Sequence, residues 1–205
     1  MDQQGFNQWA PAYEQTIDRT QGYPFEGYEE VLRYCRNQRP AGSVLSILDI
    51  GIGTGRLSQE LYEQGHEITG LDFSEEMLRI AADRMPEGRL YKADFAEGIP
   101  GAIMELKFSC ILSTYAFHHV DDDRKIQLLR LFAGRLRKDG VIAIGDIGFQ
   151  TSQDREHCRL EAGDNWDEEE WYIAADEFLP KLDKAGFKAG YRQVSGCAGV
   201  LTLSL

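Results

Sequence analysis

Residues 44–56 of this chain, which read VLSILDIGIGTGR, decide its fold. An apolar run of strand length is followed by Gly51, Gly53 and Gly55 at alternate positions. Glycine lets the backbone turn tightly and lets a ligand approach without a Cβ in its way. A strand that passes through such a loop into a helix is typical of α/β folds, which bind ligands at the carboxyl ends of their strands.

The same alternation of strand and helix continues along the chain. It predicts right-handed βαβ units, a mainly parallel sheet and therefore a doubly wound α/β fold. A short link between the last two strands predicts an antiparallel hairpin at one edge of the sheet. We expect strands at 44–50, 67–71, 90–92, 108–112, 141–147, 187–194 and 199–205, and helices at 56–64, from 74, from 121 and at 177–185, with Pro180 in the first turn of the last.

Two helical patterns precede the first strand. Apolar residues recur at helical spacing in both, and Pro40 and Gly42 then break the periodicity. We predict that residues 1–38 form an N-terminal helical cap and that residues 39–205 form a single compact unit. The residues that carry the two patterns are Phe6, Trp9, Tyr13 and Ile17, then Tyr28, Val31, Leu32 and Cys35.

The length and the net charge of the chain limit the classes of molecule that it is expected to bind. The 205 residues include 34 acidic and 22 basic ones, a net charge of −12, which predicts no binding to duplex nucleic acid and favours a small-molecule substrate. No apolar run has the length of a membrane span, and the first residues do not resemble a signal peptide, so we expect a cytoplasmic protein, monomeric or homodimeric. The acidic run 164–170, with Trp166 and Trp171 beside its carboxylates, favours a solvated face over a site for a cationic substrate or partner.

The cysteines and histidines do not predict a metal site. Cys35, Cys110 and the remaining two cysteines lie far apart without a C-x-x-C pair, which favours reduced structural thiols. His118 and His119 are adjacent, and neighbouring side chains on a strand or helix point apart. We therefore expect no metal.

Acidic residues stand at three successive positions along the sheet edge. Asp49 precedes the glycine loop, Asp72 ends the second strand, and Asp94 follows the third with Phe95 beside it. Asp72 is placed to reach ribose hydroxyls, and equally to cap the next helix. Asp94 is placed to accept from an exocyclic amine, although an Asp after a strand is often a turn residue.

The motifs LDIGIGTG, GLDFS, KADF and FSCILSTYAFHHV, followed by VIAIGDI, together resemble the class I S-adenosylmethionine-dependent methyltransferases. The N-terminal FNQWAPAYEQT resembles the small bacterial YrrT-like group. The resemblance implies a seven-stranded sheet with a reversed last strand and S-adenosylmethionine as the cofactor. It implies that the glycines line the methionine part, that Asp49 lies near the ammonium, that Asp72 holds the ribose, and that Asp94 binds the adenine amine. The implied cofactor-binding set is Asp49, Gly51, Gly53, Gly55, Asp72, Phe73, Asp94 and Phe95.

Methyl transfer is an in-line displacement, so the protein mainly aligns the reactants and excludes water. We expect acceptor-pocket walls from 113–119, 146–149 and the N-terminal cap, closed by 150–173. The catalytic candidates are His119 first, then His118 and Asp146. For each of them, a structural role is given the same weight as the catalytic one.

Two other functions stay open. A protein that binds S-adenosylmethionine or its product without catalysis would show the same motifs. A nicotinamide-dependent oxidoreductase is disfavoured, because Arg56 stands where the dinucleotide fingerprint needs its third glycine and Asp49 would repel a pyrophosphate.

Overall fold

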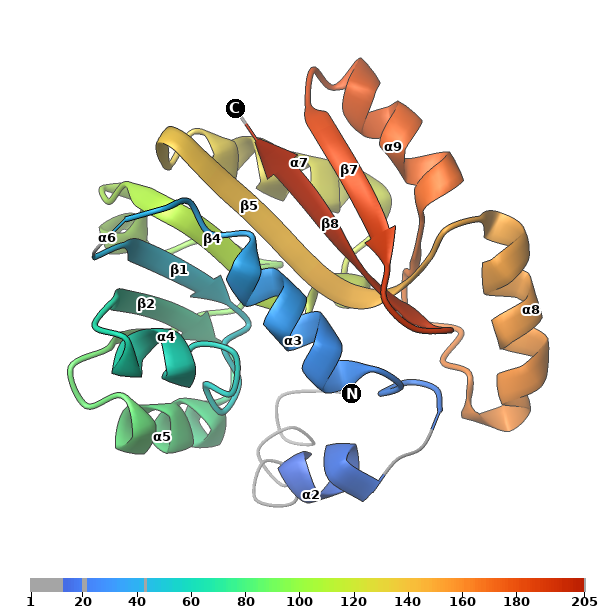
Figure 1. Ribbon diagram of the computed structural model, residues 1–205, viewed down its shortest axis with the longest axis horizontal. Coiled ribbons are helices and arrows are strands. Elements are labelled where there is room, and N and C mark those ends of the chain that lie inside the picture. Colours follow the sequence, from blue (N-terminus) through green and yellow to red (C-terminus); the bar gives the residue numbers. More distant parts are fainter. Residues whose placement is uncertain (1–12, 20–21, 43, 205) are drawn as a thin grey trace.

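The structure is a computed structural model and describes residues 13–19, 22–42 and 44–204. Its centre is a sheet in the order β3-β2-β1-β4-β5-β8-β7, with the short β6 paired to β5 (Figure 1). β8 is antiparallel to both of its neighbours, whereas the other strand pairs are parallel. The doubly wound α/β prediction and the late hairpin are thus confirmed. The strands are β1 Ser46–Ile50, β2 Glu67–Asp72, β3 Arg89–Lys92, β4 Phe108–Thr114, β5 Leu136–Phe149, β6 Ile173–Ala174, β7 Lys188–Gln193 and β8 Ala198–Ser204.

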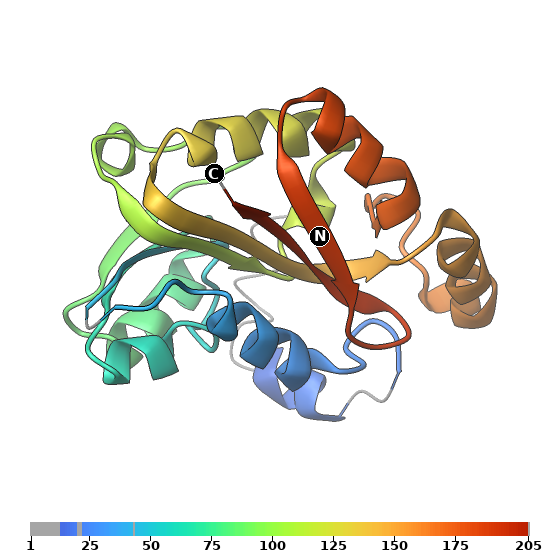
Figure 2. The ribbon, with the colours of Figure 1, turned by 45° about the horizontal axis from the view of Figure 1, so that its top comes forward.

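Helices cover both faces of the sheet (Figure 2). α3 (Tyr28–Asn37), α4 (Gln59–Glu63) and α5 (Glu75–Arg84) lie on one face, and α6 (Gly101–Met104), α7 (Asp122–Ala133) and α9 (Ala175–Lys184) lie on the other. Each face has its own cluster of buried apolar side chains. This two-layer cover follows from right-handed crossovers on either side of the first strand.

α3 shows how closely the helices approach the sheet. Its apolar residues at i, i+3, i+4 and i+7 are all buried, as their spacing predicts. It packs over β5 at Gly145, where an added Cβ would lie 2.5 Å from Cγ1 of Val31 and 2.7 Å from Sγ of Cys35. Only glycine allows this helix to rest so near the backbone of the strand.

Side-chain caps fix where several helices begin. The Ser74 hydroxyl accepts from the amide of Met77 at the start of α5, and Asp121 accepts from the amide of Arg124 at the start of α7. α8 (Ser152–Ala162), which the sequence did not predict as a helix, begins with a reciprocal capping box. There, Thr151 and Asp154 each accept from the other's backbone amide.

β5 departs from its predicted bounds because of an irregular register. It begins at Leu136, not at 141, and the pairing with β4 shifts between Phe108 and Cys110. Asp139 has a φ of +62° within this shifted segment. Asp139 and Gly140, a pair typical of a turn, lie inside the strand as part of a bulge, and α7 ends at Ala133.

Two predicted helix starts are also wrong. α4 begins at Gln59, because the glycine loop continues as turns through residue 58. α9 begins at Ala175, two residues before the predicted start, with Asp176 and Glu177 in its first turn. Pro180 consequently lies inside the helix, not in its first turn.

The N-terminal region contains α2 (Tyr13–Arg19) and α3. Phe6 and Trp9 lie outside the described residues, while Ile17 is buried in the core. The Glu14 carboxylate accepts two hydrogen bonds from Arg84 on α5 and one from the hydroxyl of Thr54 in the glycine loop. The division into a cap and a main unit remains a prediction.

None of the helices within residues 13–19, 22–42 and 44–204 has both the length and the apolar character needed to cross a membrane.

The close contact at Gly145 gives a stability test. Gly145→Ala forces the new methyl group against α3 and should lower the free energy of unfolding by about 1–3 kcal/mol, measured by urea denaturation. Gly190→Ala is the matched control, because its Cβ would meet Thr202 Oγ1 at an ordinary 3.6 Å. Both substitutions reduce the freedom of the unfolded chain equally. Equal stability of the two variants would contradict the packing argument.

Candidate functional site

A cavity opens at the carboxyl ends of β1, β2 and β4. Its walls combine the glycine loop, the acidic end of β2, an aromatic ring after β3 and the turn after β4. This is the position at which open α/β sheets bind ligands. The lining residues are Gly51, Gly53, Asp72, Phe73, Met77, Phe95, Thr114, Tyr115, Ala116 and His119.

The glycine loop is fixed to β2 by hydrogen bonds. The amides of Gly51 and Ile52 both donate to the carbonyl of Leu71, and the amide of Gly53 donates to Asp72 Oδ2 at 2.9 Å. Gly51 and Gly53 have φ values of +67° and +55°, a region that favours glycine. A Cβ at Gly53 would meet no atom of the described residues within 4 Å.

Asp72 both caps a helix and faces the cavity. Its Oδ1 accepts from the amide of Ser74 at 2.8 Å, while its Oδ2 accepts from Gly53. Burial raises the pKa of this carboxyl, and the hydrogen bonds from the Ser74 and Gly53 amides lower it by less. Because a carboxylate oxygen accepts more than one hydrogen bond, the two roles considered for Asp72 do not exclude each other.

Asp49 lies behind the loop and outside the cavity wall. The carboxyl is 1% exposed, and its Oδ2 accepts from the hydroxyl of Ser58 at 2.6 Å. Its Oδ1 has no hydrogen-bond partner among the described residues. Burial, opposed by that hydrogen bond, raises the pKa of Asp49 to about 7. Such a buried, unpaired acceptor is suited to a cationic group.

Two further predicted site residues lie away from the cavity wall. A Cβ at Gly55 would meet Met85 Cε at 2.6 Å, so this glycine allows the loop to pack against α5 and its C-terminal residue. Asp94 is exposed, and its Oδ1 accepts from the amide of Ala96, as a turn residue does. Its neighbour Phe95 does line the cavity and stacks on Phe117, with ring centroids 5.6 Å apart.

The turn after β4 brings the histidines to the site. Tyr115 has a φ of +50°, which is uncommon for a non-glycine residue and reverses the chain directly after the strand. A 3-10 turn, η2 (Phe117–His119), follows. The rings of His118 and His119 lie with their centroids 4.1 Å apart. The expectation that these side chains point apart is therefore wrong, because a tight turn is neither strand nor helix.

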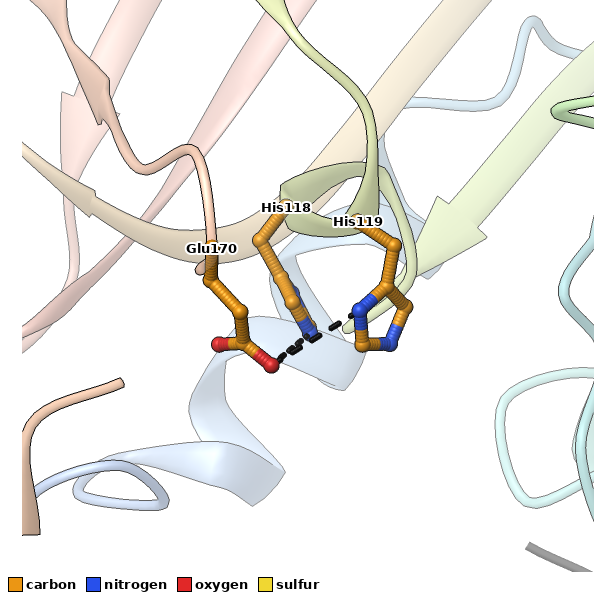
Figure 3. A group of neighbouring side chains, drawn as sticks. All are labelled: His118, His119 and Glu170. Atoms are coloured by element: carbon orange, nitrogen blue, oxygen red, sulfur yellow. Dashed lines mark ion pairs between the residues drawn. The ribbon is translucent and has the colours of Figure 1, made fainter. Parts of the chain in front are cut away.

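His118 lies between two carboxylates. Its Nδ1 is 2.6 Å from Asp146 Oδ1 on β5, and its Nε2 is 3.5 Å from Glu170 Oε1 (Figure 3). The other oxygen of Asp146 accepts from the amide of His118. Burial lowers the pKa of His118, but the facing carboxylates raise it by more. Asp146 thus fixes both the backbone and the ring of this residue.

His119 differs from its neighbour. Its Nδ1 lies 3.6 Å from Glu170 Oε1, and its side chain is 30% exposed. Burial, together with the charge of His118, lowers the pKa of His119 to about 3, so its ring is neutral at physiological pH. His119 is the catalytic candidate that lines the cavity, while His118 and Asp146 lie behind it.

Glu170 belongs to the acidic run predicted to form a solvated face and was not among the predicted site residues. That prediction is wrong at its last residue: the Glu170 side chain is 18% exposed and reaches both histidines. Its Oε2 accepts from the hydroxyl of Tyr172 at 2.6 Å. Trp166, in the same run, stacks on Tyr23 with centroids 5.3 Å apart. Trp166 within the acidic run was the signal that part of it faces inward.

Lys125 is the second residue that the sequence analysis missed. It is fully buried, and its Nζ donates to the carbonyls of Val120 at 2.6 Å and Trp171 at 2.7 Å. These bonds, with one from the amide of Trp171 to the carbonyl of His118, join the turn after β4 to the 170–172 segment. Lys125 precedes Leu128 by three residues and Leu129 by four. This spacing places it on the buried face of α7 and was the signal available in the sequence.

Comparison with known proteins gives consistent similarities. Residues 47–140 match a family described as a methyltransferase domain. An uncharacterized methyltransferase of Geobacillus thermodenitrificans is 30% identical, covering 96% of this chain and 93% of the relative. The uncharacterized methyltransferase YrrT of Halobacillus halophilus is 28% identical over the same shares of the two chains. A solved structure of the DhpI-SAM-HEP complex has a similar fold, with a TM-score of 0.72, 16% identity, and 98% and 94% of the two chains covered.

The buried Lys125 gives a test of how the site is held together. Lys125→Met leaves two buried carbonyls without their donor and should lower the free energy of unfolding by about 1–3 kcal/mol. Hydrogen exchange at the amide of Trp171 should also become faster than in the wild type. Both are measurable by urea denaturation and by exchange followed with NMR.

The control for this test is Lys181→Met. Lys181 pairs with Asp122 at 2.8 Å but is about half exposed, so its loss should change stability by less than about 0.5 kcal/mol. If Lys125→Met were as stable as this control and kept the exchange rate of Trp171, Lys125 would not join the two segments.

Proposed function

Since the chain belongs to the YrrT-like methyltransferases, we propose that it transfers a methyl group from S-adenosylmethionine to a small-molecule acceptor. The observation that carries this proposal is the cavity at the carboxyl ends of β1, β2 and β4. It brings together loop backbone at Gly53, a buried carboxylate at Asp72, an aromatic ring at Phe95 and an imidazole at His119. These are groups that suit, in turn, a flexible chain, a ribose, a purine and a reacting centre.

Four features of the site support binding of S-adenosylmethionine. No described atom fills the space beside Gly53, which leaves room for the methionine part, and Asp72 retains capacity to accept from ribose hydroxyls. The orphaned Oδ1 of Asp49 provides the charge that an ammonium group requires. Phe95 and Phe73 give apolar walls for the adenine, and Asp94 stays a proposed contact of its amine. The cofactor, when bound, supplies a methyl group on a positively charged sulfur.

His119 is the proposed contact of the acceptor, because it alone among the catalytic candidates lines the cavity. Its neutral ring offers a nitrogen lone pair instead of a charge. His118 and Asp146 hold the turn that carries it, so we propose a positioning role for both. The aromatic rings of Tyr23, Trp166 and Tyr172 pack together beside this turn and would exclude water from it.

The experiment that tests the cofactor is calorimetric titration of the purified protein with S-adenosylhomocysteine, with NADH in parallel. We expect binding of S-adenosylhomocysteine alone. Binding of NADH alone would support the oxidoreductase reading. Methyl transfer to members of an acceptor panel then separates an enzyme from a protein that binds the cofactor without catalysis.

Replacing Asp72 tests the ribose contact. Asp72→Ala should weaken S-adenosylhomocysteine by about 1–3 kcal/mol, or about 5- to 150-fold in Kd, because ribose hydroxyls lose their acceptor. Asp72→Asn keeps the shape and shows whether the charge matters. Asp83→Ala, on the exposed face of α5, is the control and should bind normally. Unchanged affinity in a folded Asp72→Ala variant would place the ribose elsewhere.

The raised pKa of Asp49 predicts a pH dependence of binding. Below about pH 7 this carboxyl is mainly protonated and cannot pair with an ammonium group, so affinity for S-adenosylhomocysteine should fall as pH is lowered from 8 to 6. The limiting slope is about tenfold per pH unit. Titrations at several pH values measure it. Asp49→Asn should bind weakly at pH 8 with a flat profile, and a retained slope in this variant would exclude Asp49 as its source.

A further inference from the structure

We infer that His118, His119 and Glu170 form a binding site for one divalent transition-metal ion of the zinc class. The three side chains converge from two segments, the turn η2 and the loop before β6, and Figure 3 shows both imidazoles directed at the same carboxylate oxygen. Two imidazoles and one carboxylate are a ligand set that zinc takes in catalytic sites, where a fourth position stays open.

The ligand atoms have nearly the required spacing. Zinc bound at about 2.0–2.2 Å in a tetrahedron has ligands about 3.4 Å apart. Glu170 Oε1 lies 3.5 Å from His118 Nε2 and 3.6 Å from His119 Nδ1. All three atoms lie within 4.8 Å of one another, so the two nitrogens need to approach by less than about 1.5 Å. A rotation of the His119 side chain would bring its Nδ1 to this spacing.

Two of the three ligands already have the outer partners that metal ligands require. Asp146 Oδ1 holds Nδ1 of His118 at 2.6 Å, which leaves Nε2 to present its lone pair toward Glu170. Glu170 in turn accepts from the hydroxyl of Tyr172, which is also 2.6 Å from the hydroxyl of Tyr23. A carboxylate behind the histidine and a fixed ligand carboxylate are the usual second layer of a metal site.

The backbone under the ligands is also fixed before any ion binds. The buried Lys125 and the bond from the Trp171 amide to the His118 carbonyl hold the two ligand-bearing segments together. The carboxylates of Asp146 and Glu170 contact the imidazoles, and Asp122 pairs with the ammonium groups of Lys125 and Lys181.

The site adjoins the cavity, because His119 belongs to both. A metal ion bound there would therefore have its open position near the reacting centre. This consequence rests on the proposed function. It favours acceptors that carry an oxygen or sulfur donor, since a Lewis acid holds and polarises such an atom.

The test is titration of the chelator-treated full chain with zinc chloride, followed by calorimetry, and with cobalt chloride, followed by its visible absorption. We expect one ion per chain. Glu170→Gln and His119→Gln should each weaken zinc binding at least tenfold, and Tyr172→Phe should weaken it less. His157→Gln is the matched control, because His157 and Glu161 form an exposed histidine–glutamate pair at 3.2 Å and should not contribute.

The outcomes separate the two proposals. Absence of zinc binding, or equal binding by Glu170→Gln and wild type while Glu170→Gln remains folded, would overturn the metal site. If the His157→Gln control lost zinc binding instead, the ion would be bound at α8, and this result would also overturn the proposed metal site. Titration of each variant with S-adenosylhomocysteine is the second readout. If the protein binds S-adenosylhomocysteine but not zinc, the proposed function stands and the metal site does not. If it binds zinc but not S-adenosylhomocysteine, only the metal site stands.

Discussion

The parallel register of β1 with β2 and β4 is the constraint on which the rest of the structure depends. Ile50 pairs with Leu71 on one side and with Ser113 on the other, so three strands end at the same edge. The glycine loop leaves β1 there and is fixed to the end of β2 through Asp72. The groups proposed to touch the cofactor follow from these strand ends and from the end of β3, which pairs with β2 and precedes Asp94 and Phe95.

The second half of the site depends on a different kind of interaction. A buried ammonium group on α7 donates to backbone on both sides of the cavity rim, which holds the histidine turn against the loop before β6. Burying such a group is costly unless it is fully bonded. That cost is met here by two carbonyls and by Asp122, and the result is a rim with a defined geometry.

These two halves also divide what the sequence predicts from what it does not. Strand–helix alternation and the glycine loop are local patterns, so the sheet, the position of Asp72 and the buried face of α3 follow from them. Glu170 meets His118 across a long loop, and no spacing rule connects them. The 3-10 turn and the bulge in β5 break the periodicities on which the prediction relies, which is why the histidines were expected to diverge and the strand to begin later.

The pairing of β5 with β6 has a consequence for how such proteins diverge. Gly148 pairs with Ile173 and Phe149 with Ala174, so the intervening segment leaves and rejoins the sheet at adjacent points. Closing a loop between fixed, neighbouring ends costs only slightly more when the loop is longer. Insertions and deletions between these two strands can therefore accumulate at little thermodynamic cost, and the rim that carries Glu170 can be exchanged as a module while the cofactor end is retained.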